Sequence, residues 1–183
     1  MAQIKYITKN APNSSYETKY QDDGAVGDVI SYIFNEEKTC GYIGGWAVNP
    51  ACAAYEMELL AKLFHKDKGV RLRHWIITFT DSELCKLESS LGCDRTMAVY
   101  RLGFLLSAYY KDLYQIVFAV HCDERPHLHM VMNTVSYKDG RKFSGSKAEY
   151  YDYEKYAKDV LHQYKLSIYT VKDHSSTKYY HAY

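Results

Sequence analysis

The 183-residue chain lacks the features that mark membrane proteins and disulfide-stapled secreted domains. No stretch reaches the roughly 18 consecutive apolar residues that a membrane-spanning helix requires. The five cysteines are odd in number and form no Cys-x-x-Cys pair, and the first residues show no signal-peptide pattern. We therefore expect a soluble protein in a reduced, cytoplasmic compartment rather than a disulfide framework.

An excess of charge of either sign is also missing. The net charge is +1 and the isoelectric point is about 7.6, so the composition carries no global signature of polyanion binding. A nucleic-acid partner would have to be attracted locally. Basic residues concentrate in two segments, each of which could equally be a solvated face: Lys62, Lys66, Lys68, Arg71 and Arg73 in the first, and Lys138, Arg141, Lys142 and Lys147 in the second.

What is present is the composition of an ordinary globular protein. Hydrophobic residues make up 47% of the chain and charged residues 25%, so we expect a single folded domain over residues 1–183. Tyrosine is abundant, with twenty copies. Its ring can stack on nucleic-acid bases, but tyrosine also favours half-buried strands, and the abundance does not choose between the two.

Hydrophobic periodicity predicts strands and helices that do not alternate regularly. We expect an α+β fold whose central sheet of about five strands is largely antiparallel, with helices packed on its faces. Capping boxes that begin at Thr80 and Ser146 mark two of the helix starts. The predicted strands cover residues 2–8, 70–80, 114–121, 127–136 and 166–171, and the predicted helices cover 25–35, 50–65, a short segment after 80, 95–111 and 147–164.

The densest group of candidate metal ligands is formed by His121, His127 and His129, which fall within nine residues. The two strands that carry them are separated by five residues, a length that suits a hairpin. His127 and His129 would project from one face of their strand. Antiparallel pairing would bring His121 opposite His127, with the Cβ atoms about 5 Å apart. The three imidazoles could then bind one divalent ion.

Asp123 lies in the predicted hairpin loop between these histidines. A carboxylate there is placed to accept a hydrogen bond from a ring N–H, the usual arrangement that fixes the tautomer of a metal ligand. The alternative is a group of ordinary surface or core histidines. The strand spacing and the neighbouring acid favour the metal site.

Tyr32 departs from the pattern of its own predicted helix. At 100° per residue it lies roughly 130° from the centre of the apolar stripe. Its hydroxyl would therefore face a partner other than the core, although an ordinary boundary tyrosine is the alternative. The stripe consists of Val26, Val29, Ile30, Ile33 and Phe34.

Together these segments resemble the relaxases, or mobilisation nucleases, of conjugative and mobilisable elements, which are histidine-hydrophobe-histidine endonucleases. The resemblance runs in consistent order from about residue 25 to 171. The interval from His121 to His127 is one residue shorter than in most of the family. Many relaxases continue into helicase, primase or coiled-coil extensions, whereas this sequence ends at residue 183, so we expect a nuclease domain alone or one cut from a longer chain. The matching segments are residues 30–39 (ISYIFNEEKT), the middle strand 73–79 (RHWIITF), the metal motif within 120–133, and 139–143 (DGRKF).

The resemblance implies a site- and strand-specific endonuclease that nicks single-stranded DNA at an origin of transfer. Tyr32 would be the nucleophile, assisted by Asp123, and would form a 5′-phosphotyrosyl link whose reversal rejoins the strand. The three histidines would hold one divalent ion, Mn²⁺ or Mg²⁺ by resemblance, although imidazoles also suit Zn²⁺, Ni²⁺ or Co²⁺. The candidate DNA contacts are Lys38, Thr39, His74, Asn133, Arg141 and Lys142.

Several of these candidates have equally plausible structural readings. His74 could be a hydrogen-bonded structural histidine that supports the site from the neighbouring strand. Asn133 shares the strand face of His127 and His129, yet could be a satisfied polar residue of the strand. Lys38 and Thr39 could simply form a polar helix exit.

By resemblance, the expected partners are single-stranded DNA, an accessory DNA-binding protein and a coupling protein in a bacterial cytoplasm, with no insertion into a membrane. Two rival functions remain. A rolling-circle replication initiator or transposase of the same superfamily shares the metal motif but normally places its tyrosine after it, whereas Tyr32 precedes the histidines. A DNA-binding module with a structural metal site would never cut.

Overall fold

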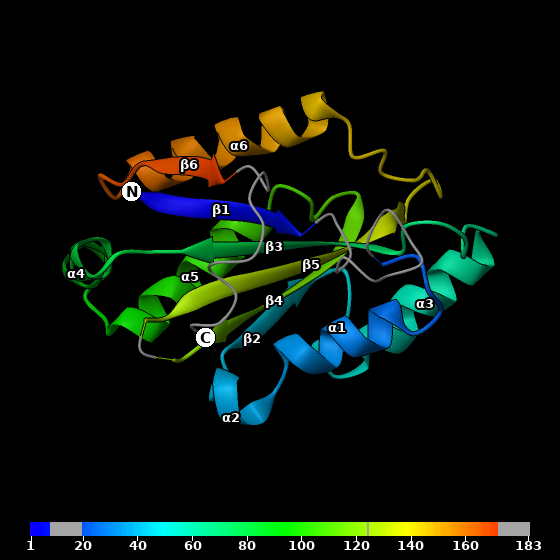
Figure 1. The fold of residues 1–183 in the computed structure, drawn as a ribbon, viewed down its shortest axis with the longest axis horizontal. Helices are drawn as coiled ribbons and strands as arrows, with labels where there is room; N and C mark the ends of the chain where they lie inside the picture. The colour runs from blue at the N-terminus through cyan, green and yellow to red at the C-terminus, as the bar shows by residue number, and fades with distance from the viewer. Residues whose placement is uncertain (8–19, 124, 172–183) are drawn as a thin grey trace.

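A single open sheet of six strands organises the molecule (Figure 1). The computed structural model describes residues 1–7, 20–123 and 125–171. The strand order is β2-β4-β5-β3-β1-β6, and all neighbours are antiparallel except β1 and β6. The predicted α+β class with a largely antiparallel sheet is confirmed. The strands are β1 (Ala2–Ile7), β2 (Ile43–Trp46), β3 (Leu72–Thr78), β4 (Tyr114–His121), β5 (His127–Ser136) and β6 (Ile168–Val171).

Local capping explains where several helices begin. The Thr80 N–H donates to the Glu83 carboxylate over 3.0 Å, and the Ser146 N–H donates to Glu149 over 2.7 Å, which confirms both predicted capping boxes. None of the described helices is long and apolar enough to cross a membrane. The helices are α1 (Ala25–Ile33), α2 (Glu36–Thr39), α3 (Ala53–Leu63, preceded by a 3₁₀ turn at Pro50–Cys52), α4 (Asp81–Leu91), α5 (Arg95–Ser107) and α6 (Lys147–His162).

Two elements were not predicted, β2 and α2. β2 contains the sequence Ile-Gly-Gly-Trp, which has low intrinsic strand propensity. Its glycines permit a close approach to β4, because a Cβ atom on Gly44 would lie 2.4 Å from the Phe118 ring. Helix α2 has only four residues and is capped by Asn35, whose side chain accepts from the Glu37 N–H. A helix this short leaves no periodic signal in the sequence.

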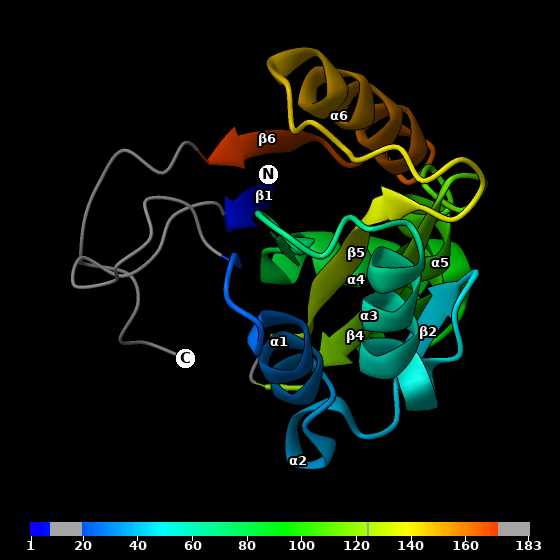
Figure 2. The same cartoon turned by 90° about the vertical axis from the view of Figure 1, so that its right-hand side faces the viewer.

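Both faces of the sheet are covered, and each has its own core. The larger core lies under α4, α5 and α6 and contains Trp75 and Phe118. The smaller core lies under α1 and α3, which pack side by side (Figure 2), and contains Ile33, Met57 and Val131. On β4 and β5, the face that supplies the smaller core also carries the three predicted metal ligands, which lie beyond its apolar residues. The candidate site therefore lies at one end of the face that α1 and α3 cover.

Candidate active site

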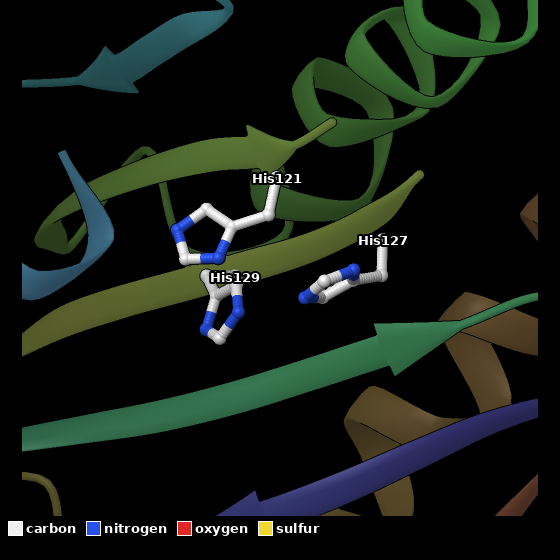
Figure 3. Close-up of side chains that lie close together, drawn as sticks. All are labelled: His121, His127 and His129. Carbon is white, nitrogen blue, oxygen red and sulfur yellow. The ribbon is translucent and has the colours of Figure 1, made fainter. Parts of the chain in front are cut away.

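The β4–β5 hairpin brings the three histidines together. His121 pairs with His127 in the strand register, and Ala119 pairs with His129, so all three side chains lie on one face of the sheet. The shortened interval between His121 and His127 fits this hairpin. One ligand nitrogen from each ring lies within 4.8 Å of the other two. Figure 3 shows the three rings turned toward one another.

One nitrogen of each ring is already engaged by the protein. Nε2 of His121 lies 3.1 Å from the Ile33 carbonyl oxygen, and Nδ1 of His127 lies 3.2 Å from the Arg125 carbonyl oxygen. Nδ1 of His129 lies 3.0 Å from another ring nitrogen, Nε2 of His74. A carbonyl can only accept, so the bonded nitrogens of His121 and His127 carry their protons. Their other nitrogens keep free lone pairs, and this donor set fits a divalent metal ion.

Burial favours the neutral, metal-binding form of these rings. The exposed fraction is 1% for His121 and 2% for His129, and His127 is half-buried. Desolvation lowers the pKa of His121 to about 4 and also lowers the pKa values of His127 and His129. The positive charge of Lys38 acts in the same direction on all three. The imidazoles are therefore ready ligands at neutral pH.

Tyr32 projects from the end of α1 over the histidines. Its ring centroid lies 5.6 Å from those of both His121 and His129, in edge-on contacts, and half of the residue surface (50%) is exposed. Ile33, the next residue, is fully buried, and its carbonyl oxygen is the partner of His121. The end of α1 is thereby tied to the hairpin. The Lys38 ammonium lies 5.0 Å from the centroid of the Tyr32 ring.

Three residues predicted to contact DNA are buried within the protein. His74 is buried between His129 and Tyr20. The Asn133 amide donates over 3.0 Å to both the Met57 carbonyl oxygen and Gln115 Oε1, and its oxygen accepts from the Val135 N–H. Thr39 is completely buried. These bonds favour the structural interpretation of His74 and Asn133, and the DNA contacts of all three residues stay predictions.

Asp123 is exposed on the hairpin loop. Its charge tends to raise the pKa values of His121 and His127, but it is not the largest influence on either. Among the described residues, no hydrogen bond joins its carboxylate to the three rings. The ring-orienting partners are two backbone carbonyls and His74. Sequence reasoning missed the carbonyls because no side-chain motif marks the position of a distant backbone oxygen.

Arg141 and Lys142 lie at the opposite end of the sheet from the histidines. From His129 to Ser136 strand β5 spans about 23 Å, at about 3.3 Å per residue. The Lys142 ammonium donates to the carbonyl oxygens of Lys66 and Lys68, which joins the two basic segments of the sequence. We call the combined patch the far-end basic surface, and it consists of Lys66, Lys68, Arg71, Arg73, Arg141 and Lys142.

Two histidines that flank one hydrophobic residue on a central strand, with a third histidine opposite, form the arrangement of the histidine-hydrophobe-histidine endonucleases. A comparison of the sequence with protein-family models identifies one family within that class. Residues 32–166 match the model for "Relaxase: MobA/VirD2-like, nuclease domain", so the chain belongs to this family of DNA-nicking enzymes that act in mobilisation. Searches of curated proteins and of solved structures found no match.

Proposed function

We propose that this chain nicks and rejoins single-stranded DNA at an origin of transfer, using Tyr32 as the nucleophile. The observation that carries the proposal is the position of Tyr32. Its ring faces His121 and His129 at equal distance, while half of its surface remains open to a DNA strand. A phenol is a weak nucleophile until its proton leaves, so a nucleophilic tyrosine requires a site of this kind.

In the proposed reaction the Tyr32 oxygen attacks the scissile phosphorus. A phosphorus–oxygen bond forms to the tyrosine, the bond to the 3′ oxygen breaks, and that oxygen takes up a proton. The link preserves the energy of the phosphodiester, so the reverse reaction rejoins the strand without ATP. A divalent ion held by His121, His127 and His129 would polarise the phosphate and offset its charge.

The protein's own groups prepare this step. The carbonyls of Ile33 and Arg125 orient two of the rings. Lys38 adds a positive charge beside Tyr32, where the phosphate must lie. Asp123 remains a proposed assistant to the tyrosine, acting from the exposed loop. Three imidazoles suit Zn²⁺, Ni²⁺ or Co²⁺ as ligands, whereas the family resemblance favours Mn²⁺ or Mg²⁺.

The placement of the other tyrosines favours a relaxase over a rolling-circle initiator or transposase. In such enzymes the nucleophile normally follows the metal motif. Here the tyrosines of α6 follow it, but α6 packs on the larger core, across the sheet from the histidines. Tyr153, for example, is fully buried against that core. The tyrosines of α6 therefore lie on the other face from the metal site, whereas the exposed Tyr32 lies beside it.

The test is the formation of a covalent adduct. Labelled single-stranded oligonucleotides that span the transfer origin, incubated with the protein and Mn²⁺, should yield a denaturation-resistant protein–DNA band. Tyr32→Phe should abolish the band, whereas Tyr151→Phe, on an exposed tyrosine of α6, should not. An unchanged band in the Tyr32→Phe variant would refute the nucleophile. Cleavage without any adduct would indicate a hydrolase.

We further propose that the DNA continues from Tyr32 toward Arg141 and Lys142. A separation of about 23 Å corresponds to at most about seven nucleotides, because one strand of a duplex advances about 3.4 Å per nucleotide and an extended single strand advances further. These residues would then hold flanking DNA rather than the scissile phosphate. An accessory DNA-binding protein and a coupling protein, in a bacterial cytoplasm, complete the proposed setting.

A further inference from the structure

A buried chain of side chains leads away from the metal site through β3. Nδ1 of His129 lies 3.0 Å from Nε2 of His74, and Nδ1 of His74 lies 3.0 Å from the Tyr20 hydroxyl oxygen. All three residues are buried. Both ring nitrogens of His74 are therefore used in contacts with protein groups, one of which is a metal-ligand candidate.

The fold holds each member of this chain in place. His74 pairs with Val131 in the β3–β5 register, which puts it diagonally across from His129 on the same face. Tyr20 has a left-handed backbone, with φ of 68°, and its carbonyl oxygen accepts from the Arg71 N–H over 2.8 Å. Its ring belongs to the smaller core. The sheet therefore anchors His129 and His74, and the smaller core anchors Tyr20.

We propose that His74 and Tyr20 are positioning residues for the metal site, which hold His129 in the tautomer that leaves Nε2 free for the ion. This inference rests on the metal-binding part of the proposed function. Outer partners of metal-bound histidines commonly fix the ring orientation and tautomer in this way. Here a histidine and a tyrosine take the place that the sequence suggested for Asp123.

The positions of the protons along the chain decide which nitrogen of His129 can bind the ion. In one direction, His129 Nδ1–H donates to His74 Nε2, and His74 Nδ1–H donates to the Tyr20 oxygen. In the other direction, Tyr20 donates to His74, and His74 donates to His129 Nδ1. The proton of His129 then sits on Nε2 and blocks that nitrogen as a ligand. Metal binding therefore requires the first direction, in which His74 Nε2 and the Tyr20 oxygen are acceptors.

The experiment measures Mn²⁺ affinity by calorimetry without DNA. His74→Leu removes the acceptor and should weaken binding by about 10–100-fold. His74→Gln offers an amide oxygen in a similar position and should recover most of the affinity. Tyr20→Phe should cause a smaller loss than His74→Leu. The matched control is His162→Gln, on the exposed last turn of α6, which should bind as the unchanged protein does.

A second readout detects the tautomer directly. In the Zn²⁺-loaded protein, two-bond nitrogen–proton NMR spectra should show His129 protonated at Nδ1. Protonation at Nε2 with metal bound, or His74→Leu affinity within twofold of the unchanged protein, would overturn the proposal. Thermal unfolding without metal checks that each variant folds. If His74→Leu does not fold, the Mn²⁺ affinity of Tyr20→Phe decides the question. An affinity equal to that of the unchanged protein would overturn the proposed role of the hydrogen-bond chain.

These outcomes are separable from failure of the proposed nicking activity. If the variants show the predicted pattern of Mn²⁺ affinities but no covalent adduct forms, the positioning role of His74 and Tyr20 is supported and the proposed nicking reaction is refuted. If the unchanged protein forms the adduct and His74→Leu binds Mn²⁺ normally, the nicking reaction is supported and the positioning role is refuted.

Discussion

Tyr32 and Lys38 belong to different helices, yet their side chains share one space beside the histidines. The Lys38 ammonium lies over the ring at 5.0 Å from its centroid and also acts on the charge state of all three imidazoles. Lysine is a compact, strongly hydrated point charge that suits a phosphate. At the scale of single residues, Lys38 is therefore the DNA-contact candidate with the best position.

Lys38→Gln should lower the rate of covalent adduct formation by at least about tenfold, because it removes a charge placed to stabilise the transferring phosphate. Its Mn²⁺ affinity should not fall, since a neighbouring cation opposes metal binding. The control is Lys86→Gln on the exposed face of α4. Quantified gel bands over time give the rates. An equal loss in both variants would show that the effect is not local.

The lowered pKa of His121 should make the free energy of unfolding decrease as the pH falls. Burial lowers this pKa from an ordinary value of 6.5 to about 4, so the unfolded chain binds more protons between these limits. The metal-free protein should therefore lose stability as the pH falls through this window, by up to about 3 kcal/mol.

Urea unfolding at pH 7, 5.5 and 4.5 measures this effect. His121→Gln should flatten the pH profile, whereas His162→Gln should leave its slope in place. A His121→Gln profile as steep as that of the unchanged protein would assign the slope to other groups.

At the scale of elements, helix α5 packs unusually closely on β4. A Cβ atom added at Gly103 would lie 2.5 Å from the fully buried ring of Phe118. Gly103→Ala should therefore destabilise the protein by about 1–3 kcal/mol, because the well-packed ring cannot move freely.

Gly27 in α1 provides the matched control, since a Cβ there would have no neighbour within 4 Å. Gly27→Ala should stabilise the protein by up to about 1 kcal/mol through helix propensity. Urea unfolding of both variants compares the two. Stabilisation by both substitutions would contradict the close packing of α5 on Phe118.

Elements with local signals could be predicted, and those defined by their neighbours could not. The capping boxes at Thr80 and Ser146 act within four residues, so the sequence alone locates those helix starts. β2 exists as a strand because it pairs with β4 and fits against Phe118. The same distinction applies to the site. The histidine spacing predicted the hairpin, but the bond from His121 to Ile33 joins residues 88 apart in sequence.

At the scale of the whole molecule, the far-end basic surface lies apart from the three histidines in a chain whose net charge is only +1. The far-end basic surface lies where β3 begins and β5 ends, and the histidines lie where β4 ends and β5 begins (Figure 1). This separation predicts that affinity for DNA and the chemical step respond to different substitutions.

The double variant Lys66→Gln, Arg141→Gln should bind long oligonucleotides more weakly. A plot of the logarithm of its affinity against the logarithm of the salt concentration should have a shallower slope than that of the unchanged protein. The slope should fall by about 0.7–0.9 for each phosphate that the variant no longer neutralises. Lys142 is spared because it bonds to backbone carbonyls.

Fluorescence anisotropy at several salt concentrations supplies the slopes. Oligonucleotides that end close to the nick, too short to reach the far-end basic surface, should bind the variant normally. The charge-matched control is a double variant, Lys86→Gln with Lys158→Gln, in which both residues lie on exposed helical faces. Equal weakening of short and long oligonucleotides would contradict the proposed path.

The parallel pairing of β1 with β6 has a consequence for biosynthesis. Of the described strands β1 is synthesised first, but its outer neighbour β6 spans Ile168–Val171 and is synthesised after the other five. All segments that carry the candidate metal ligands have been made once His129 has been synthesised. During translation the nascent chain can thus assemble its ligands while one edge of β1 still has unpaired backbone groups, the kind of edge that promotes aggregation. Synthesis of the last strand closes that period of exposure.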